Sequence, residues 1–193
     1  MITNTIYRQV ERLSELLRAD SRAEGLEHGL QPVQLEILHY LAMCNRFSDT
    51  PMAVVEYLGV TKGTVSQTLK VLEQKGLVYK VADEEDKRSF HLKLTTEGKQ
   101  LVQTLFPTSL FETAVARLPN RQQEEVSRSL HTLLHSLLQA NGQKTFGVCQ
   151  SCRYNRRRQD GSYFCNLVKV ALDRSDIELL CREHEPSERA LSQ

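Results

Sequence analysis

Apolar side chains recur every three or four residues in several stretches of the chain, which is the spacing of one helical face. A first helix is expected over residues 3–19, followed by a polar, glycine-containing stretch over residues 21–29. Pro32 then stands at the first position of a second helix, where its missing N–H costs nothing. The two apolar faces comprise Ile6, Val10, Leu13 and Leu17, and then Leu35, Leu38 and Leu41.

Two short helices are expected next, with a tight turn between them. The first covers residues 51–58 and is ended by Gly59. Thr61 is a favourable N-cap for the second, which runs to about Lys75, and Gly76 closes it. Such a pair is typical of a helix-turn-helix.

The apolar period changes from 3.6 to 2 after this pair. Residues 77–81 and 90–94 alternate between apolar and other side chains, and the polar tip DEEDKRS lies between them. This alternation predicts a two-stranded hairpin. A hairpin directly after a helix-turn-helix makes a winged helix-turn-helix.

The second helix of the pair has an apolar face of Val65, Leu69 and Leu72 and an opposite face that is small, polar and basic. Glutamine pairs bidentately with adenine, and serine or threonine bonds bases or phosphates. We therefore expect this helix to enter the major groove while the first crosses the phosphate backbone. The DNA-contacting residues expected on it are Thr61, Lys62, Gly63, Thr64, Ser66, Gln67 and Lys70.

The hairpin tip adds Lys87 and Arg88, which we expect to reach the minor groove or its phosphates. The neighbouring residues 83–86 are acidic and would be repelled by DNA. We expect Asp86 to orient Arg88, and the other carboxylates to face solvent.

Further helices follow the hairpin. Thr95 or Thr96 caps a helix that Pro107 interrupts, and Asn120 caps a final strong helix that ends near residue 141. The first and last helices lie at the two ends of a small winged-helix core. This core offers too little apolar surface to cover the apolar faces of both helices. We therefore expect a homodimer interface, which also supplies the two-fold symmetry of an operator. The apolar stripe of the final helix consists of Val126, Leu130, Leu133, Leu134 and Leu137.

Residues 60–99, VTKGTVSQTLKVLEQKGLVYKVADEEDKRSFHLKLTTEGK, resemble the MarR family of bacterial regulators. The pieces that carry the resemblance are LEQKGLV, the wing DEEDKRS and LTTEGK, and the order of elements fits over roughly residues 3–140. The resemblance implies a homodimer that binds a pseudo-palindromic operator and usually represses transcription. It also implies release from DNA by a small, often phenolic, effector or by cysteine oxidation. The plain alternative is a helical bundle with a surface hairpin.

Composition sets limits on the fold and the function but identifies neither. The 193 residues suffice for one domain and a small appendage, and 40% hydrophobic content is a globular value. The net charge of +1 requires that any DNA-binding surface come from local basic clusters. The N-terminus has no apolar segment of a secretory signal and no run is long enough to span a bilayer, so we expect a cytoplasmic protein.

Four of the five cysteines lie in the C-terminal tail: Cys149, Cys152, Cys165 and Cys181. The C-x2-C pair is the strongest local signal, because it presents two thiolates to one metal. His184 lies at x2 beyond the last cysteine, so either four cysteines bind or His184 replaces Cys165. We favour the four cysteines, because so short a segment has little hydrophobic core and needs a bound metal to stabilise its fold. Zinc fits such a set, an iron–sulfur cluster is the alternative, and disulfides or free thiols remain as the plain interpretation.

Other candidates carry weaker signals. A basic run over residues 153–158 is either a solvated loop or a second phosphate contact. Cys44 ends an apolar helix and is expected to be a buried core thiol rather than a redox sensor. His131 and His135 have i, i+4 spacing but lack the glutamate of the metalloprotease motif, so we expect surface or interface histidines.

The sequence thus predicts a mainly α fold with a small β-hairpin wing. It comprises a winged-helix DNA-binding and dimerisation domain over residues 1–142 and a cysteine-rich metal-binding tail over residues 143–193. We expect a DNA-binding regulator with a structural or sensory metal site, and not an enzyme. The alternatives are a metal-dependent redox protein or enzyme, or a zinc-stabilised interaction adaptor, on a winged-helix scaffold.

Overall fold

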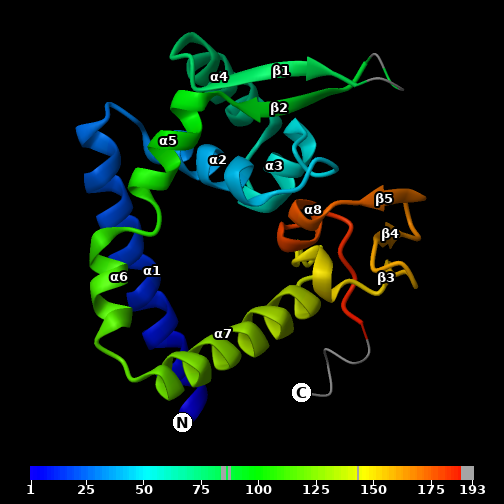
Figure 1. Cartoon of the computed structure of the whole chain (residues 1–193). Coiled ribbons are helices and arrows are strands. Elements are labelled where there is room, and N and C mark those ends of the chain that lie inside the picture. Colours follow the sequence, from blue (N-terminus) through cyan, green and yellow to red (C-terminus); the bar gives the residue numbers. More distant parts are fainter. Residues whose placement is uncertain (84–85, 87, 143, 188–193) are drawn as a thin grey trace.

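The computed structural model describes residues 1–83, 86, 88–142 and 144–187, and shows a winged-helix body that carries long helices on one side and a small tail on the other (Figure 1). A two-stranded antiparallel hairpin, in which Val78 pairs with Leu94, forms the wing. The body consists of α1 (Ile2–Glu27), α2 (Pro32–Met43), α3 (Pro51–Leu58), α4 (Lys62–Gln74), β1 (Val78–Ala82), β2 (Phe90–Leu94), α5 (Thr96–Leu105), α6 (Ser109–Ala116) and α7 (Asn120–Ala140).

Threonine caps set the starts of four helices of the body. The side chains of Thr50, Thr61, Thr95 and Thr108 each accept a hydrogen bond from the backbone N–H three residues on, at the starts of α3, α4, α5 and α6. Each cap satisfies a donor that the first helical turn leaves free. The expected helix-turn-helix, wing and interruption at Pro107 are confirmed.

Two expected helix ends are wrong. The first helix continues through the polar stretch to Glu27, because Gly25 packs directly against the Leu35 side chain of α2. Asn120 is the first residue of α7 rather than its cap. Gln123, in the first turn of α7, instead satisfies the end of α6, since its side-chain amide donates to the carbonyls of Val115 and Leu118.

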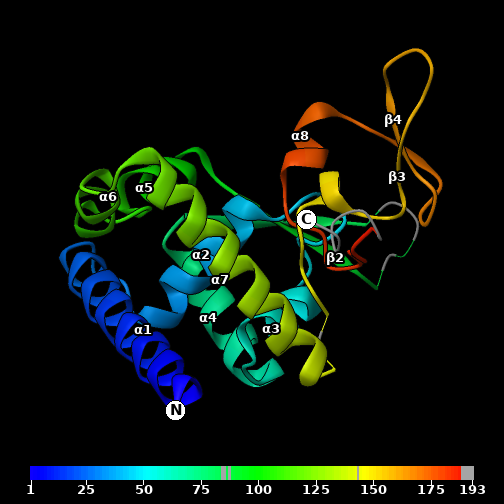
Figure 2. The same cartoon turned by 90° about the horizontal axis from the view of Figure 1, so that it is seen from below.

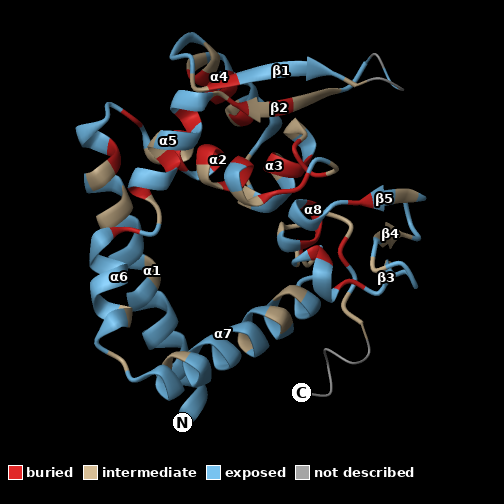
Figure 3. Cartoon of the chain, viewed as in Figure 1, coloured by how far each residue is buried: buried red, intermediate tan, exposed pale blue. Residues whose placement is uncertain are grey.

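The main core lies between α2, α3, α4, α5 and the hairpin, where buried residues concentrate (Figure 3). Tyr40 at its centre is fully buried and donates to the Ser48 carbonyl. By contrast, α6 and α7, which the structure describes in full, contain no buried residue. In Figure 1, α7 runs from the lower left, below the body, toward the tail. No helix within the described ranges is long and apolar enough to cross a membrane.

The tail forms its own small layer beside the body. It contains a single 3-10 turn η1 (Cys149–Ser151), a three-stranded antiparallel sheet in the order β3 (Asn155–Arg157), β4 (Tyr163–Cys165), β5 (Val170–Leu172), and a short helix α8 (Arg174–Glu178). Seen from below, the β3–β4 hairpin projects away from the helices (Figure 2). Phe146, ahead of η1, inserts into the main core edge-to-face with Tyr40 and Tyr57. The tail therefore shares a core with the body.

Candidate DNA-binding surface and cysteine site

The turn between α3 and α4 exposes the start of α4. Gly59 adopts φ 65°, a left-handed conformation that favours glycine, and ends α3. Thr61 then caps α4 by accepting from the Thr64 N–H at 3.1 Å. Because Val65, Leu69 and Leu72 are buried in the core, the opposite side of α4 faces outward.

The expected contact residues of α4 lie on that outward side. Thr61, Lys62, Gly63, Ser66, Gln67 and Lys70 are exposed. Thr64 is half-buried, and its hydroxyl lies 2.9 Å from that of Thr61. Thr64 therefore supports the cap and has less freedom to contact a base than the other residues.

The wing presents Arg88 on its exposed end. Asp86 was expected to orient the Arg88 guanidinium, but its carboxylate instead accepts from the Arg88 backbone N–H at 3.0 Å and from the Ser89 hydroxyl at 2.8 Å. Asp86 thus shapes the turn rather than the side chain. Lys87, along with Glu84 and Glu85, lies outside the described residues.

A basic cleft of about 480 Å³ lies between α3, α4 and the wing. Lys62 and Ser66 of α4 line it, together with Lys80 and Arg88 of the wing. Arg182, which comes from the tail, also lines it. Local cations, rather than net charge, therefore provide a surface that suits phosphate.

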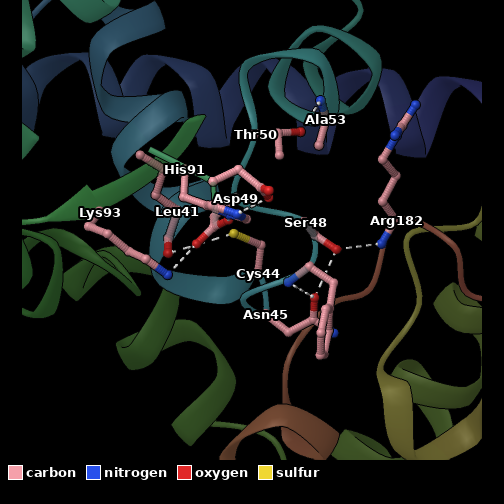
Figure 4. A network of polar contacts seen from close by, with 12 residues as sticks. Leu41, Cys44, Asn45, Ser48, Asp49, Thr50, Ala53, His91, Lys93 and Arg182 are labelled. Carbon is pink, nitrogen blue, oxygen red and sulfur yellow. Dashed lines mark hydrogen bonds and ion pairs between the residues drawn. The ribbon is translucent and has the colours of Figure 1, made fainter. Parts of the chain in front are cut away.

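The wing is tied to the α2–α3 loop (residues 44–50) by buried Asp49 (Figure 4). The Asp49 carboxylate pairs with Lys93, and the His91 imidazole lies between Asp49 and Asp83. Hydrogen bonding to Asp49, supported by Asp83, raises the pKa of His91 above its usual range despite partial burial. His91 thus helps to fix the wing relative to the loop.

The four tail cysteines gather in one region of the tail. Cys149 and Cys152 flank η1, where the Cys152 N–H donates to the Cys149 carbonyl at 3.0 Å. Cys165 ends β4 and Cys181 follows α8, and both pack with Cys149 on one apolar cluster around Leu172 and Ile177. All four cysteines are free. Three of the four expected ligands thus pack on one apolar cluster, and Cys152 is joined to it only through the η1 turn.

The thiols are not arranged as a finished metal centre. Within the described ranges, no three or more His, Cys, Asp or Glu side chains are placed to hold a metal ion together. Burial, with the other three cysteines, raises the pKa of Cys149 to about 12. Burial also raises the pKa of Cys181. Both thiols thus carry protons at neutral pH in this state.

His184, the alternative ligand, is engaged elsewhere. Its Nδ1 lies 2.7 Å from the Thr145 hydroxyl and its Nε2 lies 2.9 Å from that of Ser151. The His184 ring also packs closely on Gly147, since a Cβ added to Gly147 would lie 2.5 Å from the His184 Cε1. Because both ring nitrogens have partners, the arrangement favours Cys165 over His184 as the fourth ligand.

The weaker candidates from the sequence have different outcomes in the structure. Cys44 is buried, and burial raises its pKa to about 12, as expected for a core thiol. In the basic run, Arg153 pairs with Glu185 and Arg158 stacks on Phe164, while Arg156 and Arg157 are exposed on the projecting hairpin. Single residues of the tail that lack a spacing pattern, such as Phe146 and Arg182, were missed, because no sequence signal marks their partners on the body.

Comparison with known proteins agrees with this geometry. Residues 28–89 match a sequence model described as MarR family. The organic hydroperoxide resistance transcriptional regulator of Bacillus subtilis (strain 168) is 27% identical over 135 residues, which span 67% of this chain and 92% of that protein.

Solved structures of the same kind resemble the body. The S. aureus MepR–DNA complex is 26% identical with a TM-score of 0.53, over 69% of this chain and 96% of that one. A MarR transcriptional regulator from Methanosarcina mazei Go1 shares the fold at 22% identity, with a TM-score of 0.61 over 71% of this chain and 99% of that one. The family match and these structures show that the body is similar to MarR-type winged-helix transcriptional regulators, one of which, MepR, is seen in a complex with DNA.

Proposed function

We propose that the chain acts as a homodimer that binds a pseudo-palindromic operator and represses transcription. The observation that carries this proposal is the outward face of α4, where Lys62, Ser66, Gln67 and Lys70 are exposed beside a basic cleft. Such a face suits the major groove, and Arg88 on the wing suits the adjacent phosphates or minor groove.

The partner in the dimer is a second copy of the chain. The final helix α7 has apolar side chains along one stripe, yet Leu130, Leu134 and Leu137 are 48%, 57% and 54% exposed. Helix α1 repeats this pattern, with Leu13 49% exposed. Exposed apolar stripes of this extent mark an interface. Two copies give the two-fold symmetry that a palindromic operator requires.

Substitution of Gln67 tests base reading on α4. We expect Gln67→Ala to relax the preference at one operator position, at a cost of about 1–3 kcal/mol for the lost bidentate pair. We expect Lys70→Ala to weaken binding to all sequences alike and to lower the salt slope by about 1. Selection from random duplexes, followed by anisotropy titrations at several salt concentrations, measures both effects.

The matched control is Gln139→Ala, which replaces an exposed glutamine on α7. This variant should bind DNA as the parent does. Equal weakening of every sequence by Gln67→Ala would show that Gln67 contacts the backbone and not a base. A parent protein without sequence preference on genomic fragments at physiological salt would overturn the operator proposal itself.

We also propose that Cys149, Cys152, Cys165 and Cys181 bind one metal ion, with zinc favoured and an iron–sulfur cluster as the alternative. The packing of Cys149, Cys165 and Cys181 on one small apolar cluster supports this proposal, as does the hydrogen bond that joins Cys152 to Cys149. So does the engagement of both His184 nitrogens by hydroxyl groups. Zinc prefers four thiolates in a tetrahedral set, and it would replace their protons on binding.

Metal content after anaerobic purification tests this site. We expect one zinc per chain and no visible absorption, with zinc lost in Cys165→Ser and retained in His184→Ala. A brown protein with iron and sulfide would identify the cluster instead. Purified protein that takes up neither metal after reduction would contradict the proposal.

A cleft of about 550 Å³ between α1, α2, α5 and α6 is lined by mostly apolar side chains, including Leu17, Phe106 and Phe111. We propose it as the site of a small apolar effector, because it joins the winged-helix core to the helices that we assign to the dimer interface.

A further inference from the structure

The cysteine-bearing tail holds the α2–α3 loop through its own backbone. The Leu180 N–H donates to the Met43 carbonyl at 2.8 Å, and the Asn45 N–H donates to the Leu180 carbonyl at 2.9 Å. Two residues on, the Arg182 N–H donates to the Ser48 hydroxyl at 2.8 Å. The segment from Leu180 to Arg182, with Cys181 between them, is therefore paired to the loop that leads into α3. Figure 4 shows the Arg182–Ser48 bond of this pairing.

The loop also holds a buried amide beside this segment. Asn45 is 1% exposed, and its Nδ2 has no hydrogen-bond partner among the described residues. A buried amide without a partner is costly, and Asn45 is bonded through its backbone to Leu180, the neighbour of Cys181.

Arg182 carries the link from the loop to the helix-turn-helix. Its guanidinium forms two hydrogen bonds with the Glu56 carboxylate of α3, at 2.7 and 2.6 Å. The same side chain lines the basic cleft beside Lys62 and Arg88. A bidentate arginine–carboxylate pair fixes orientation as well as distance. The position of Arg182 thus bears on both α3 and the cleft.

The other side of the loop is held by the wing. The Leu92 N–H donates to the Asp49 carbonyl at 2.7 Å, in addition to the pairs that His91 and Lys93 form with the Asp49 side chain. One short loop therefore contacts the tail, α3 and the wing. Movement of the Leu180–Arg182 segment would therefore reach the loop and α3 directly through hydrogen bonds, and the wing through Asp49.

We propose that metal binding at the cysteine site is coupled to the helix-turn-helix through Leu180–Arg182, so that the metal-bound tail holds α3 and the wing in the DNA-binding arrangement. This inference rests on the metal site proposed above. Here Arg182 is a positioning residue, since it acts through Glu56. Metal binding and DNA binding then raise each other's affinity by the same factor.

Hydrogen exchange on the full chain, with Zn²⁺ as the probe, tests the coupling without DNA. We expect Zn²⁺ to slow amide exchange at the α2–α3 loop and α3 relative to protein stripped by a chelator under reducing conditions. Operator affinity should rise about 10-fold with Zn²⁺, within the usual range of coupling between sites.

Glu56→Gln separates coupling from metal binding. This variant should bind the same amount of Zn²⁺, while the metal effect on α3 exchange and operator affinity falls to about 2-fold or less. The double exchange Glu56→Arg with Arg182→Glu should restore part of the effect. Glu125→Gln, which breaks the exposed Arg121–Glu125 pair on α7, is the matched control and should keep the full effect.

The outcomes distinguish the proposals. Equal α3 exchange with and without bound Zn²⁺ would overturn the coupling, and so would a chain that binds no Zn²⁺. Full metal dependence in Glu56→Gln would also overturn the assigned route. Slowed α3 exchange without any operator binding would support the coupling and reject the proposed regulator function instead.

Discussion

Leu130→Glu combined with Leu134→Glu should convert the protein to a monomer and lower its operator affinity at least ~100-fold, because a dimer gains from binding two linked half-sites. The two leucines lie one turn apart on α7 and are about half exposed in the single chain. Burying each leucine contributes about 1.5–3 kcal/mol, and a symmetric interface loses four of them in the double variant.

Folding of the single chain should survive this change. Helix α7 contains no buried residue, so neither substitution removes a core side chain. Glutamate is also a good helix former. Sedimentation equilibrium should show a monomer with an unchanged far-ultraviolet circular dichroism spectrum, while anisotropy measures the operator affinity.

Thr132→Glu combined with Gln139→Glu is the matched control. Both positions are exposed on the opposite side of α7, at 100° per residue, and the pair adds the same charge. The control should stay dimeric and bind the operator as the parent does. A leucine double variant that remained dimeric would place the interface elsewhere and refute the role of the α7 stripe.

The helix-turn-helix was predictable because its signals are local. Thr61 is followed three residues later by the N–H that it caps, and Gly59 ends α3 as expected, in a left-handed conformation. The apolar spacing of Val65, Leu69 and Leu72 corresponds to the face that is buried. Interactions within one or two turns leave a pattern in the sequence that can be read directly.

Interactions between distant segments left no such pattern. The Arg182–Glu56 pair joins residues 126 positions apart, and Arg182 occupies an unspecified x position of the C-x2-H spacing, which indicates no partner on the body. Phe146 completes an aromatic cluster with Tyr40 and Tyr57 from a stretch without periodicity. The tail was therefore recognised by its cysteine spacing but not as part of the same core.

The choice of fourth ligand shows the same limit. Spacing places Cys165 and His184 equally well beside the other three cysteines. Only the folded chain brings Thr145 and Ser151, residues from outside the C-x2-H turn, to the two nitrogens of His184. Spacing identifies which atoms are chemically able to bind, and tertiary contacts determine which of them are free.

Gly98→Ala should destabilise the folded protein by about 3 kcal/mol, the upper part of the range for overpacking a filled site. Gly98 lies in the first turn of α5, where an added Cβ would be 2.2 Å from the Leu77 carbonyl oxygen. That oxygen belongs to the backbone and accepts a hydrogen bond from the Thr95 N–H at 3.1 Å, so it cannot move away from the added Cβ. Alanine is favoured over glycine in a helix by only about 1 kcal/mol, and the clash therefore outweighs the gain.

Chemical denaturation at one fixed protein concentration measures this loss, since the proposed dimerisation would make apparent stability depend on concentration. Gly63→Ala is the matched control, because its Cβ would meet nothing nearer than the Thr61 hydroxyl oxygen at 3.7 Å. We expect its stability to equal or slightly exceed that of the parent. If Gly98→Ala were as stable as Gly63→Ala, α5 would not pack on the Leu77 backbone, and the close contact between the end of α4, the wing and α5 would be wrong.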